Sequence, residues 1–249
     1  TLDGTLFPYT TLFRSLLTTN EYTKYTMRGE SNGLTIDTQS SQEGLNRDYI
    51  TQWSYGVDET MTLLIPNYMG GASSSKLGED SHTAERIAET FGRGNIEKIM
   101  DGLRFSTYWG TQPGTSGPVY LGAIVMLLFV FGLFVLDKRL LWWLVPMIIL
   151  TVMLSWGKNF QWLTDIFIDY VPLYNKFRTV SMTLVAAGFG ITLIAMLALK
   201  EVLNPQADKK KFVKPLLVST AITGGISLLF AVIPSLAGNF SSEMDAHIA

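Results

Sequence analysis

The sequence predicts an α-helical integral membrane protein in which a mixed, polar segment precedes four transmembrane helices. Composition indicates this class: charged residues make up only 16% of the 249 residues, against about 25% in a typical globular domain, while apolar residues reach 47%. The distribution of the apolar residues indicates it more directly. Four stretches of 18 to 24 residues contain no Asp, Glu, Lys or Arg: 119–136, 140–157, 179–199 and 215–238.

Each of the four stretches is long enough to cross a bilayer as a helix. A hydrocarbon core of about 30 Å requires roughly 20 apolar residues, with a range of about 17–25. Pro146 and Pro234 fall inside two of the stretches, and transmembrane helices tolerate such prolines where neighbouring helices satisfy the freed carbonyl groups. We therefore expect a membrane domain over residues 119–238.

Basic residues in the connecting loops predict the orientation. Lys138 and Arg139 separate the first two stretches and five lysines separate the last two, whereas the loop 158–178 carries three basic residues. Basic residues are enriched in cytoplasmic loops, so the side with seven is predicted to be cytoplasmic. The polar region 16–118, the loop 158–178 and residues 239–249 then lie on the extracytoplasmic side.

Composition also excludes several classes of function. The net charge of −2 argues against a nucleic-acid-binding protein, which usually carries a basic face. The absence of cysteine rules out disulfides, thiol catalysis and cysteine-based metal sites, and two histidines leave no histidine-rich metal site. The expected partners are therefore membrane lipids rather than nucleic acid, and no metal-ligating residues are predicted.

The first fifteen residues are predicted to be an artefact of sequencing. Residues 5–15 have the sequence TLFPYTTLFRS, which back-translates to a common short-read sequencing adapter. A chance match of this length is very improbable, and such segments are excluded from fold reasoning. We accordingly expect residues 1–15 to be foreign to the natural protein, and the chain to be a fragment that lacks its natural N-terminus.

A first candidate site lies in residues 53–60, WSYGVDET. Tyr55 offers an aromatic ring that can stack on a sugar face, and Asp58 and Glu59 offer carboxylates that accept hydrogen bonds from hydroxyl groups. A carboxylate within hydrogen-bond reach of an acceptor hydroxyl can also act as a general base. The alternative is a solvated turn with two surface acids.

A second candidate is the turn-rich aromatic loop 108–120, which leads directly into the first apolar stretch. On the functional interpretation, this loop, which includes Trp109, forms one wall of a cleft at the membrane surface. The alternative is a rigid entry loop whose aromatic residues simply lie at the membrane interface, where tryptophan and tyrosine are enriched.

A third candidate covers residues 156–178. Its apolar residues recur at the spacing of a helix that lies on the membrane surface: Leu163, Ile166, Phe167 and Tyr170. Asp165 and Asp169 share one face of that helix. Lys176 and Arg178 follow just before the third stretch, where they can hold a lipid phosphate, Arg178 bidentately. The alternative is ordinary snorkelling of basic side chains to the interface.

Three motifs, in this order, resemble the bacterial YfhO family of membrane proteins. They are WSYG with ETMTLLIPNYMGG, then YWGTQPGTSGPVYLGA, then SWGKNFQWLTDIFIDYVPLYNKFRTVS, and a hydrophobic stretch follows them. The resemblance runs from about Tyr22 to Leu203, and the long third motif is the most specific. It implies a multi-pass protein with more spans than the four counted here.

The resemblance also implies a GT-C-like fold and activity. YfhO-type proteins are similar to GT-C glycosyltransferases, so the expected reaction moves a sugar from a polyprenyl-phosphate donor to a cell-envelope glycan or polymer, outside the bacterial cytoplasmic (inner) membrane. In the GT-C class, an acidic residue of the first extracytoplasmic loop serves as base or metal ligand. No residue here matches it, so we expect the catalytic residue upstream and the fragment to be inactive alone, and a divalent cation stays open as cofactor.

Under this resemblance, the candidates for substrate binding are Arg178, Lys176, Asp58, Glu59, Tyr55 and Trp109. The two cations would neutralise charge on the leaving phosphate, while the acids and rings would hold the acceptor. Two other functions stay open: a transporter or flippase for lipid-linked glycans, and a non-enzymatic envelope protein that binds glycan. Translocation paths usually carry charged residues inside their spans, and the four stretches contain none, which disfavours transport.

Overall fold

The computed structural model describes residues 18, 21–22, 45–75, 81–92, 107–117, 119–172, 174–176 and 178–237. The expected artefact at residues 1–15 and the expected tail at 239–249 lie outside the described residues. The described residues are mostly helical and contain no strand, and an isolated antiparallel bridge joins Gly70 to Tyr108. The predicted helical class is therefore confirmed for this part of the chain.

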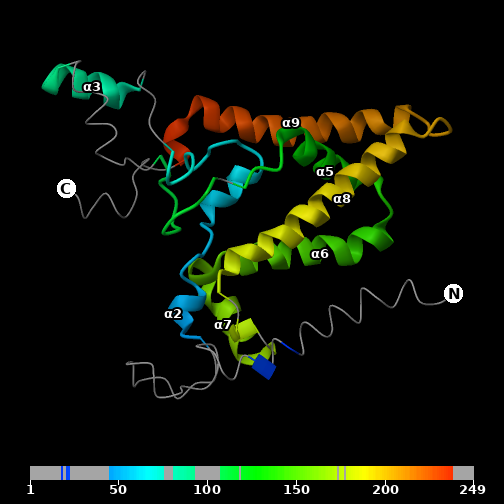
Figure 1. The fold of residues 1–249 in the computed structure, drawn as a ribbon. Coiled ribbons are helices and arrows are strands. Elements are labelled where there is room, and N and C mark those ends of the chain that lie inside the picture. Colours follow the sequence, from blue (N-terminus) through cyan, green and yellow to red (C-terminus); the bar gives the residue numbers. More distant parts are fainter. Residues whose placement is uncertain are drawn as a thin grey trace.

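A polar group of helices precedes an apolar bundle along the chain (Figure 1). The polar group consists of α2 (Arg47–Ile50), the 3-10 helix η1 (Asp58–Leu63) and α3 (His82–Phe91). The bundle consists of α5 (Ala123–Val135), α6 (Lys138–Ser155), α8 (Leu184–Leu203) and α9 (Lys210–Val232). Shorter helices flank these: η3 (Gly157–Phe160), α7 (Gln161–Tyr170), η4 (Tyr174–Lys176), η5 (Val180–Thr183) and η6 (Pro234–Ala237).

Three of the described helices are long and apolar enough to cross a membrane: α6, η5 continued by α8, and α9. Pro146 lies inside α6, as expected. Pro234 was expected inside a span, and that expectation is wrong, because α9 ends at Val232. The residue before a proline is disfavoured in helical conformation, and Ile233 accordingly leaves the helix with φ −124° and ψ 75°.

The stretch 119–136 forms a shorter helix than predicted. α5 contains 13 residues, which span about 20 Å at about 1.5 Å per residue, against a core of about 30 Å. The chain before α5 is not helical: Gly122 has φ +108°, and Leu121 N–H donates to Leu63 O at 3.3 Å. Part of the apolar stretch therefore packs on η1 instead of extending the helix, and the fourth span stays a prediction.

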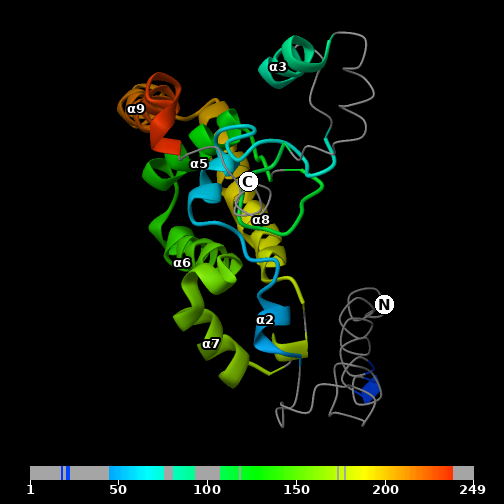
Figure 2. The same cartoon turned by 90° about the vertical axis from the view of Figure 1, so that its left-hand side faces the viewer.

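α8 lies at the centre of the bundle, where it packs against α5 and α6, while α9 packs against α5 (Figures 1 and 2). Glycines allow the close approach. A Cβ on Gly190 of α8 would lie 2.7 Å from Ile148 Cγ1, and a Cβ on Gly132 of α5 would lie 2.6 Å from Ile194 Cγ2. The buried core between these helices consists of Leu63, Leu144, Ile148, Ala187, Ile191 and Ile194.

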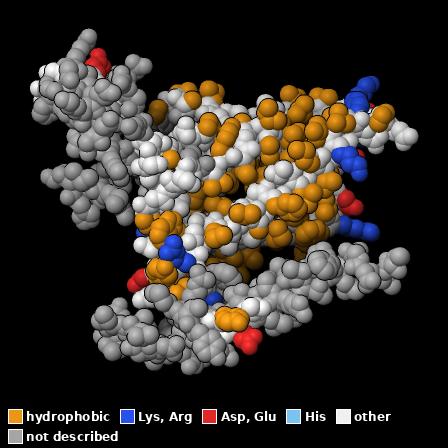
Figure 3. Space-filling model, in the orientation of Figure 1, with side chains coloured by type: hydrophobic (Ala, Val, Ile, Leu, Met, Phe, Trp, Pro, Cys, Tyr) orange, Lys and Arg blue, Asp and Glu red, His pale blue; other side chains and the backbone are white. Residues whose placement is uncertain are grey.

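The outer surface of the bundle is apolar, and basic residues gather at one end. Figure 3 shows hydrophobic side chains across the helices, with Lys and Arg side chains where α8 joins α9 and where α6 begins. Exposed apolar patches of this size mark contact with lipid or protein partners. Together with the lengths of the three helices, this surface indicates a membrane protein. The helices α2 and α7 lie at the opposite end of the bundle (Figure 1).

Candidate functional site

The first and third candidate segments meet at the end of the bundle opposite the lysine-rich loop. Tyr55 N–H donates to Ser155 O at 2.8 Å, at the last residue of α6. Lys158 N–H donates to Ser54 Oγ at 2.8 Å, and Asn159 Nδ2 donates to Tyr55 O at 2.8 Å. Two motifs are thus joined directly, and the residues of the last two contacts lie 104 positions apart in the chain.

A glycine makes this contact possible. Gly157 has φ +46°, and a Cβ there would lie 2.1 Å from Ser54 Oγ and 2.5 Å from Val180 Cγ2. Ser54 is itself fully buried, and its hydroxyl donates to Thr51 O at 2.6 Å. A larger side chain at position 157 would therefore have to displace a buried, hydrogen-bonded serine.

The two acids of the first segment have opposite environments. Asp58 is exposed, whereas Glu59 is only 1% exposed. Three protein groups donate to the Glu59 carboxylate: Gly56 N–H to Oε2 at 3.0 Å, the Tyr108 hydroxyl to Oε1 at 2.9 Å, and Gln112 Nε2 to Oε1 at 3.1 Å. Glu59 therefore ties the first segment to the second. We call residues 53–60, 108–112 and 155–159 the interlocked unit.

Burial raises the pKa of three side chains in the interlocked unit: Glu59, Tyr108 and Tyr55. It raises the pKa of Glu59 above the ordinary value of 4.5, and the hydrogen bonds from the three donors oppose this shift. Burial also raises the pKa of Tyr108, and the nearby Glu59 carboxylate raises it further. The pKa of Tyr55 is raised chiefly by burial as well. Both tyrosines therefore keep their hydroxyl protons across the physiological range.

The two aromatic candidates also differ in exposure. Tyr55 is 1% exposed and belongs to the interior of the interlocked unit. Trp109 is partly buried; its main-chain N–H donates to Met69 O at 3.2 Å, and it packs on the buried residues Tyr68 and Tyr108. In this arrangement Tyr55 offers no free ring face, and Trp109 keeps part of its surface.

Arg178 lies on two aromatic side chains of the polar segment. Its guanidinium carbon is 4.7 Å from the centroid of the Trp53 ring and 5.2 Å from that of Tyr49. Its Nη1 also donates to the Tyr49 hydroxyl at 2.7 Å. Aromatic faces attract cations electrostatically. We call Tyr49, Trp53 and Arg178 the arginine cluster.

The arginine cluster keeps its positive charge free of acidic partners. Arg178 is exposed, and it forms no ion pair with a carboxylate in the part of the chain that the structure describes. The remaining guanidinium N–H groups can therefore donate to an anion. Lys176, the last residue of η4, is partly buried. The two predicted cations thus have different settings.

Two members of the arginine cluster were missed by sequence reasoning. Trp53 stands at the start of the WSYG motif, so its presence in a candidate segment was a usable signal. Tyr49 carried no local signal, because 129 positions separate it from Arg178, whose guanidinium donates a hydrogen bond to its hydroxyl. The pairing depends on the fold rather than on a motif.

The acids of α7 share one face, as predicted, and an arginine from the polar group holds them. Arg47 Nη1 lies 2.7 Å from Asp165 Oδ1, and Arg47 Nη2 lies 2.5 Å from Asp169 Oδ1. This partner was not predicted, because the ion pairs join positions more than a hundred residues apart. The helix itself begins at Gln161 and ends at Tyr170, which covers the predicted apolar positions.

The described residues do not fit a divalent cation. Among them, no group of three or more His, Asp or Glu side chains could hold a metal ion. The buried carboxylate of Glu59 faces N–H and O–H donors, which a cation would have to displace.

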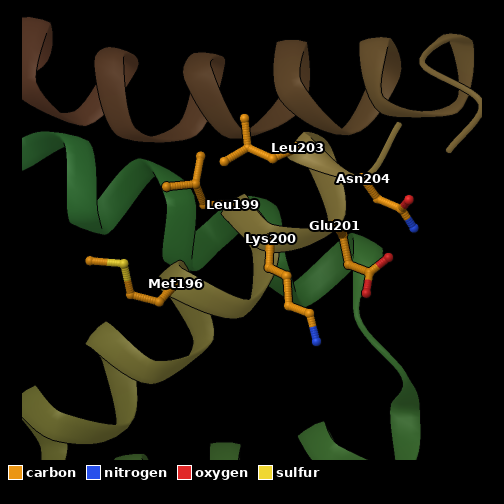
Figure 4. A pocket seen from close by; sticks show the side chains of 6 residues that line it. All are labelled: Met196, Leu199, Lys200, Glu201, Leu203 and Asn204. Atoms are coloured by element: carbon orange, nitrogen blue, oxygen red, sulfur yellow. The ribbon is translucent and has the colours of Figure 1, made fainter. Parts of the chain in front are cut away.

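A shallow, open hollow of about 540 Å³ lies at the other end of the bundle, along the last turns of α8 (Figure 4). Its lining consists of Met196, Leu199, Lys200, Glu201, Leu203 and Asn204. Lys200 and Leu203 point in different directions from the helix, so the hollow has a polar side and an apolar side. None of the six predicted site residues lines it.

No family model matches the chain, and no similar curated protein or solved structure is found. The candidate site therefore rests on two local arrangements: a carboxylate enclosed by hydrogen-bond donors, and a guanidinium held on aromatic rings.

Proposed function

We propose that this chain belongs to a GT-C-like glycosyltransferase of the bacterial cytoplasmic membrane. The reaction would move a sugar from a polyprenyl-phosphate donor to a cell-envelope glycan or polymer. The resemblance of the three motifs to the YfhO family supports the reaction, and the three long apolar helices support the membrane location. In this proposal α5 is a fourth, shorter span, and the interlocked unit lies on the extracytoplasmic side.

The arginine cluster carries the proposal. A polyprenyl phosphate presents its phosphate at the membrane surface, beside the apolar helices that its chain contacts. Arg178 comes two residues before η5, which leads into the first turn of α8, whereas the lysine-rich loop follows the last turn of α8. Its planar fork matches the oxygens of a phosphate, and Tyr49 and Trp53 hold the guanidinium in place.

The acceptor would lie next to the arginine cluster. Trp53 belongs both to the arginine cluster and to the interlocked unit, whose buried residues Ser54 and Tyr55 follow it. Asp58 is the exposed acid of the pair, and Trp109 is partly exposed. These two side chains are the ones we propose for contact with acceptor hydroxyl groups and sugar faces. No catalytic base is assigned among the described residues.

Binding of a donor analogue tests the proposal. The chain, purified in detergent, is titrated with farnesyl phosphate and with farnesol, which has the same apolar chain but no phosphate. We expect preference for the phosphate, and a loss of about tenfold in affinity for Arg178→Ala, the equivalent of one charge-assisted hydrogen bond. Lys176→Ala should lose less.

Arg139→Ala is the matched control, because Arg139 is an exposed arginine at the opposite end of the bundle. Its affinity for farnesyl phosphate should equal that of the wild type. Equal affinities of wild type and Arg178→Ala would contradict the proposal, as would equal binding of farnesol and farnesyl phosphate by the wild type.

The hydrogen bonding of the buried Glu59 carboxylate favours a second candidate function, the binding of glycan without catalysis. Both oxygens of this carboxylate accept hydrogen bonds within the protein, an arrangement that suits a rigid binding surface better than a general base. The second function is therefore non-enzymatic binding of envelope glycan. A YfhO-type protein with the same three motifs decides between them: labelled glycan formed from a labelled lipid-linked sugar supports transfer, and glycan binding without transfer supports the alternative.

A further inference from the structure

The short helix α2 connects two parts of the molecule that sequence analysis treats separately. At its first residue, Arg47 pairs with Asp165 and Asp169 of α7. Two residues later, Tyr49 accepts a hydrogen bond from Arg178. Figures 1 and 2 both show α2 beside α7 at this end of the molecule. One turn of helix thus carries both the ion pairs and a member of the arginine cluster.

Besides the ion pairs, a buried cluster and main-chain hydrogen bonds restrain α2 and the residues that flank it. Ile50 packs in a small buried cluster with Ile168 and Val180, and its carbonyl accepts from Thr179 N–H at 3.3 Å. The helix has only four residues, so its own hydrogen bonds contribute little to its stability, because short helices are marginal in water. The ion pairs and this cluster therefore hold α2 in place, together with hydrogen bonds from Leu45 N–H to Asn175 O at 3.1 Å and from Ser181 N–H to Trp53 O at 3.3 Å.

The geometry of the ion pairs fixes the direction of the Arg47 side chain. Two different nitrogens of one guanidinium contact two different carboxylates, one turn apart on α7. The three side chains are between 34% and 48% exposed, so solvent weakens each pair but does not replace it. A planar fork that bridges two acids orients a backbone better than a single point charge does.

We infer that Arg47 is a positioning residue for the arginine cluster: its two ion pairs with α7 hold α2 so that Tyr49 can fix the Arg178 guanidinium. The inference rests on the proposed binding of phosphate at Arg178. In this inference, Arg47 acts on the arginine cluster only through α2, and Asp165 and Asp169 of α7 serve to hold Arg47. Loss of the Arg47 side chain should loosen α2, which the Ile50 cluster still holds, while the interlocked unit stays folded.

A distance measurement tests the positioning directly. The chain has no cysteine, so spin labels can be attached to cysteines at Asp48 and Lys158, two exposed positions on α2 and on the interlocked unit. Pulsed electron resonance in detergent should show one narrow distance peak for the otherwise wild-type chain. Arg47→Gln should broaden this peak, and Arg47→Lys should restore it in part.

The control variant is Arg86→Gln, which removes another arginine–carboxylate pair, with Glu89, on the exposed surface of α3. This variant should leave the distance peak unchanged. A narrow peak in Arg47→Gln would overturn the inference.

Ligand binding provides the second readout. Arg47→Gln should bind farnesyl phosphate about fivefold more weakly than wild type, the scale of partly exposed ion pairs, and Arg86→Gln should bind normally. A broadened peak with unchanged affinity would overturn the positioning role. If the wild type binds no farnesyl phosphate, the proposed function fails, and the distance peak still decides whether Arg47 holds α2.

Discussion

The interlocked unit and the arginine cluster share the segment around Trp53, yet the charged group of the first is buried and that of the second is exposed. Glu59 is enclosed, and three protein groups donate to its carboxylate. Arg178 is exposed, and aromatic rings rather than a carboxylate hold it. An enclosed carboxyl group that accepts its hydrogen bonds within the protein joins parts of the fold and is not available to a ligand. A charged group that is oriented but left unpaired is available to a ligand.

The largest effect should come from the junction of the interlocked unit. Gly157→Ala should destabilise the chain by about 3 kcal/mol or more. The added Cβ meets Ser54, and the alanine would have to adopt a left-handed backbone conformation. Thermal unfolding in detergent measures this. Gly225→Ala is the control, since a Cβ there meets nothing within 4 Å. Equal melting temperatures for the two variants would refute the proposed close contact.

Removal of the enclosed carboxylate should have the next largest effect. Glu59→Ala leaves the Tyr108 hydroxyl and the Gln112 amide without their acceptor, at a cost of about 2 kcal/mol. The neighbouring variant Asp58→Ala removes an exposed acid and should change stability by less than about 0.5 kcal/mol. Chemical denaturation of both variants gives the comparison, and similar losses would show that Glu59 is no more structural than Asp58.

The pH dependence of stability provides a smaller, signed effect. Burial raises the pKa of Glu59 in the folded chain, so the folded state binds this proton more tightly than the unfolded state does. This proton binding stabilises the fold fully when the pH is below 4.5, the ordinary pKa of the group. The stabilisation is lost as the pH rises through the raised pKa of Glu59 in the folded chain. The wild type should therefore lose stability relative to Glu59→Gln as the pH rises above 4.5; a constant difference between their melting temperatures would contradict this.

The smallest effects should separate the two aromatic partners of Arg178. Trp53→Ala removes the nearer ring and should weaken binding of farnesyl phosphate about threefold, the scale of an exposed cation–π contact. Tyr49→Phe keeps its ring and loses only the hydroxyl that accepts from Arg178, so it should change affinity less. Calorimetric titration measures both. A larger loss in Tyr49→Phe would mean that the hydrogen bond, not the rings, orients the guanidinium.

Much of the membrane bundle could be predicted from the sequence, because a helix in lipid must be apolar over its whole circumference. The stretches 140–157 and 179–199 correspond closely to α6 and to η5 with α8. The stretch 119–136 overestimated α5, since apolar residues can also pack as extended chain on a neighbouring segment. Proline 234 ended α9 earlier than hydropathy alone indicated.

The candidate site was less predictable, because its contacts join distant parts of the chain. Arg178 was predicted from its place before an apolar stretch, and the shared face of Asp165 and Asp169 followed from helical spacing. Their partners Tyr49 and Arg47 could not be predicted, since no local pattern specifies a contact across more than a hundred residues.

Photocrosslinking tests the central claim, that the arginine cluster binds the phosphate end of a polyprenyl donor. A farnesyl phosphate analogue with a diazirine next to the phosphate is activated on the purified chain, and the labelled peptides are mapped by mass spectrometry. We predict labelling at residues 49–53 and around Arg178, reduced by excess farnesyl phosphate and lost in Arg178→Ala. Labelling of the hollow at Met196–Asn204 instead, unchanged in Arg178→Ala, would contradict the account.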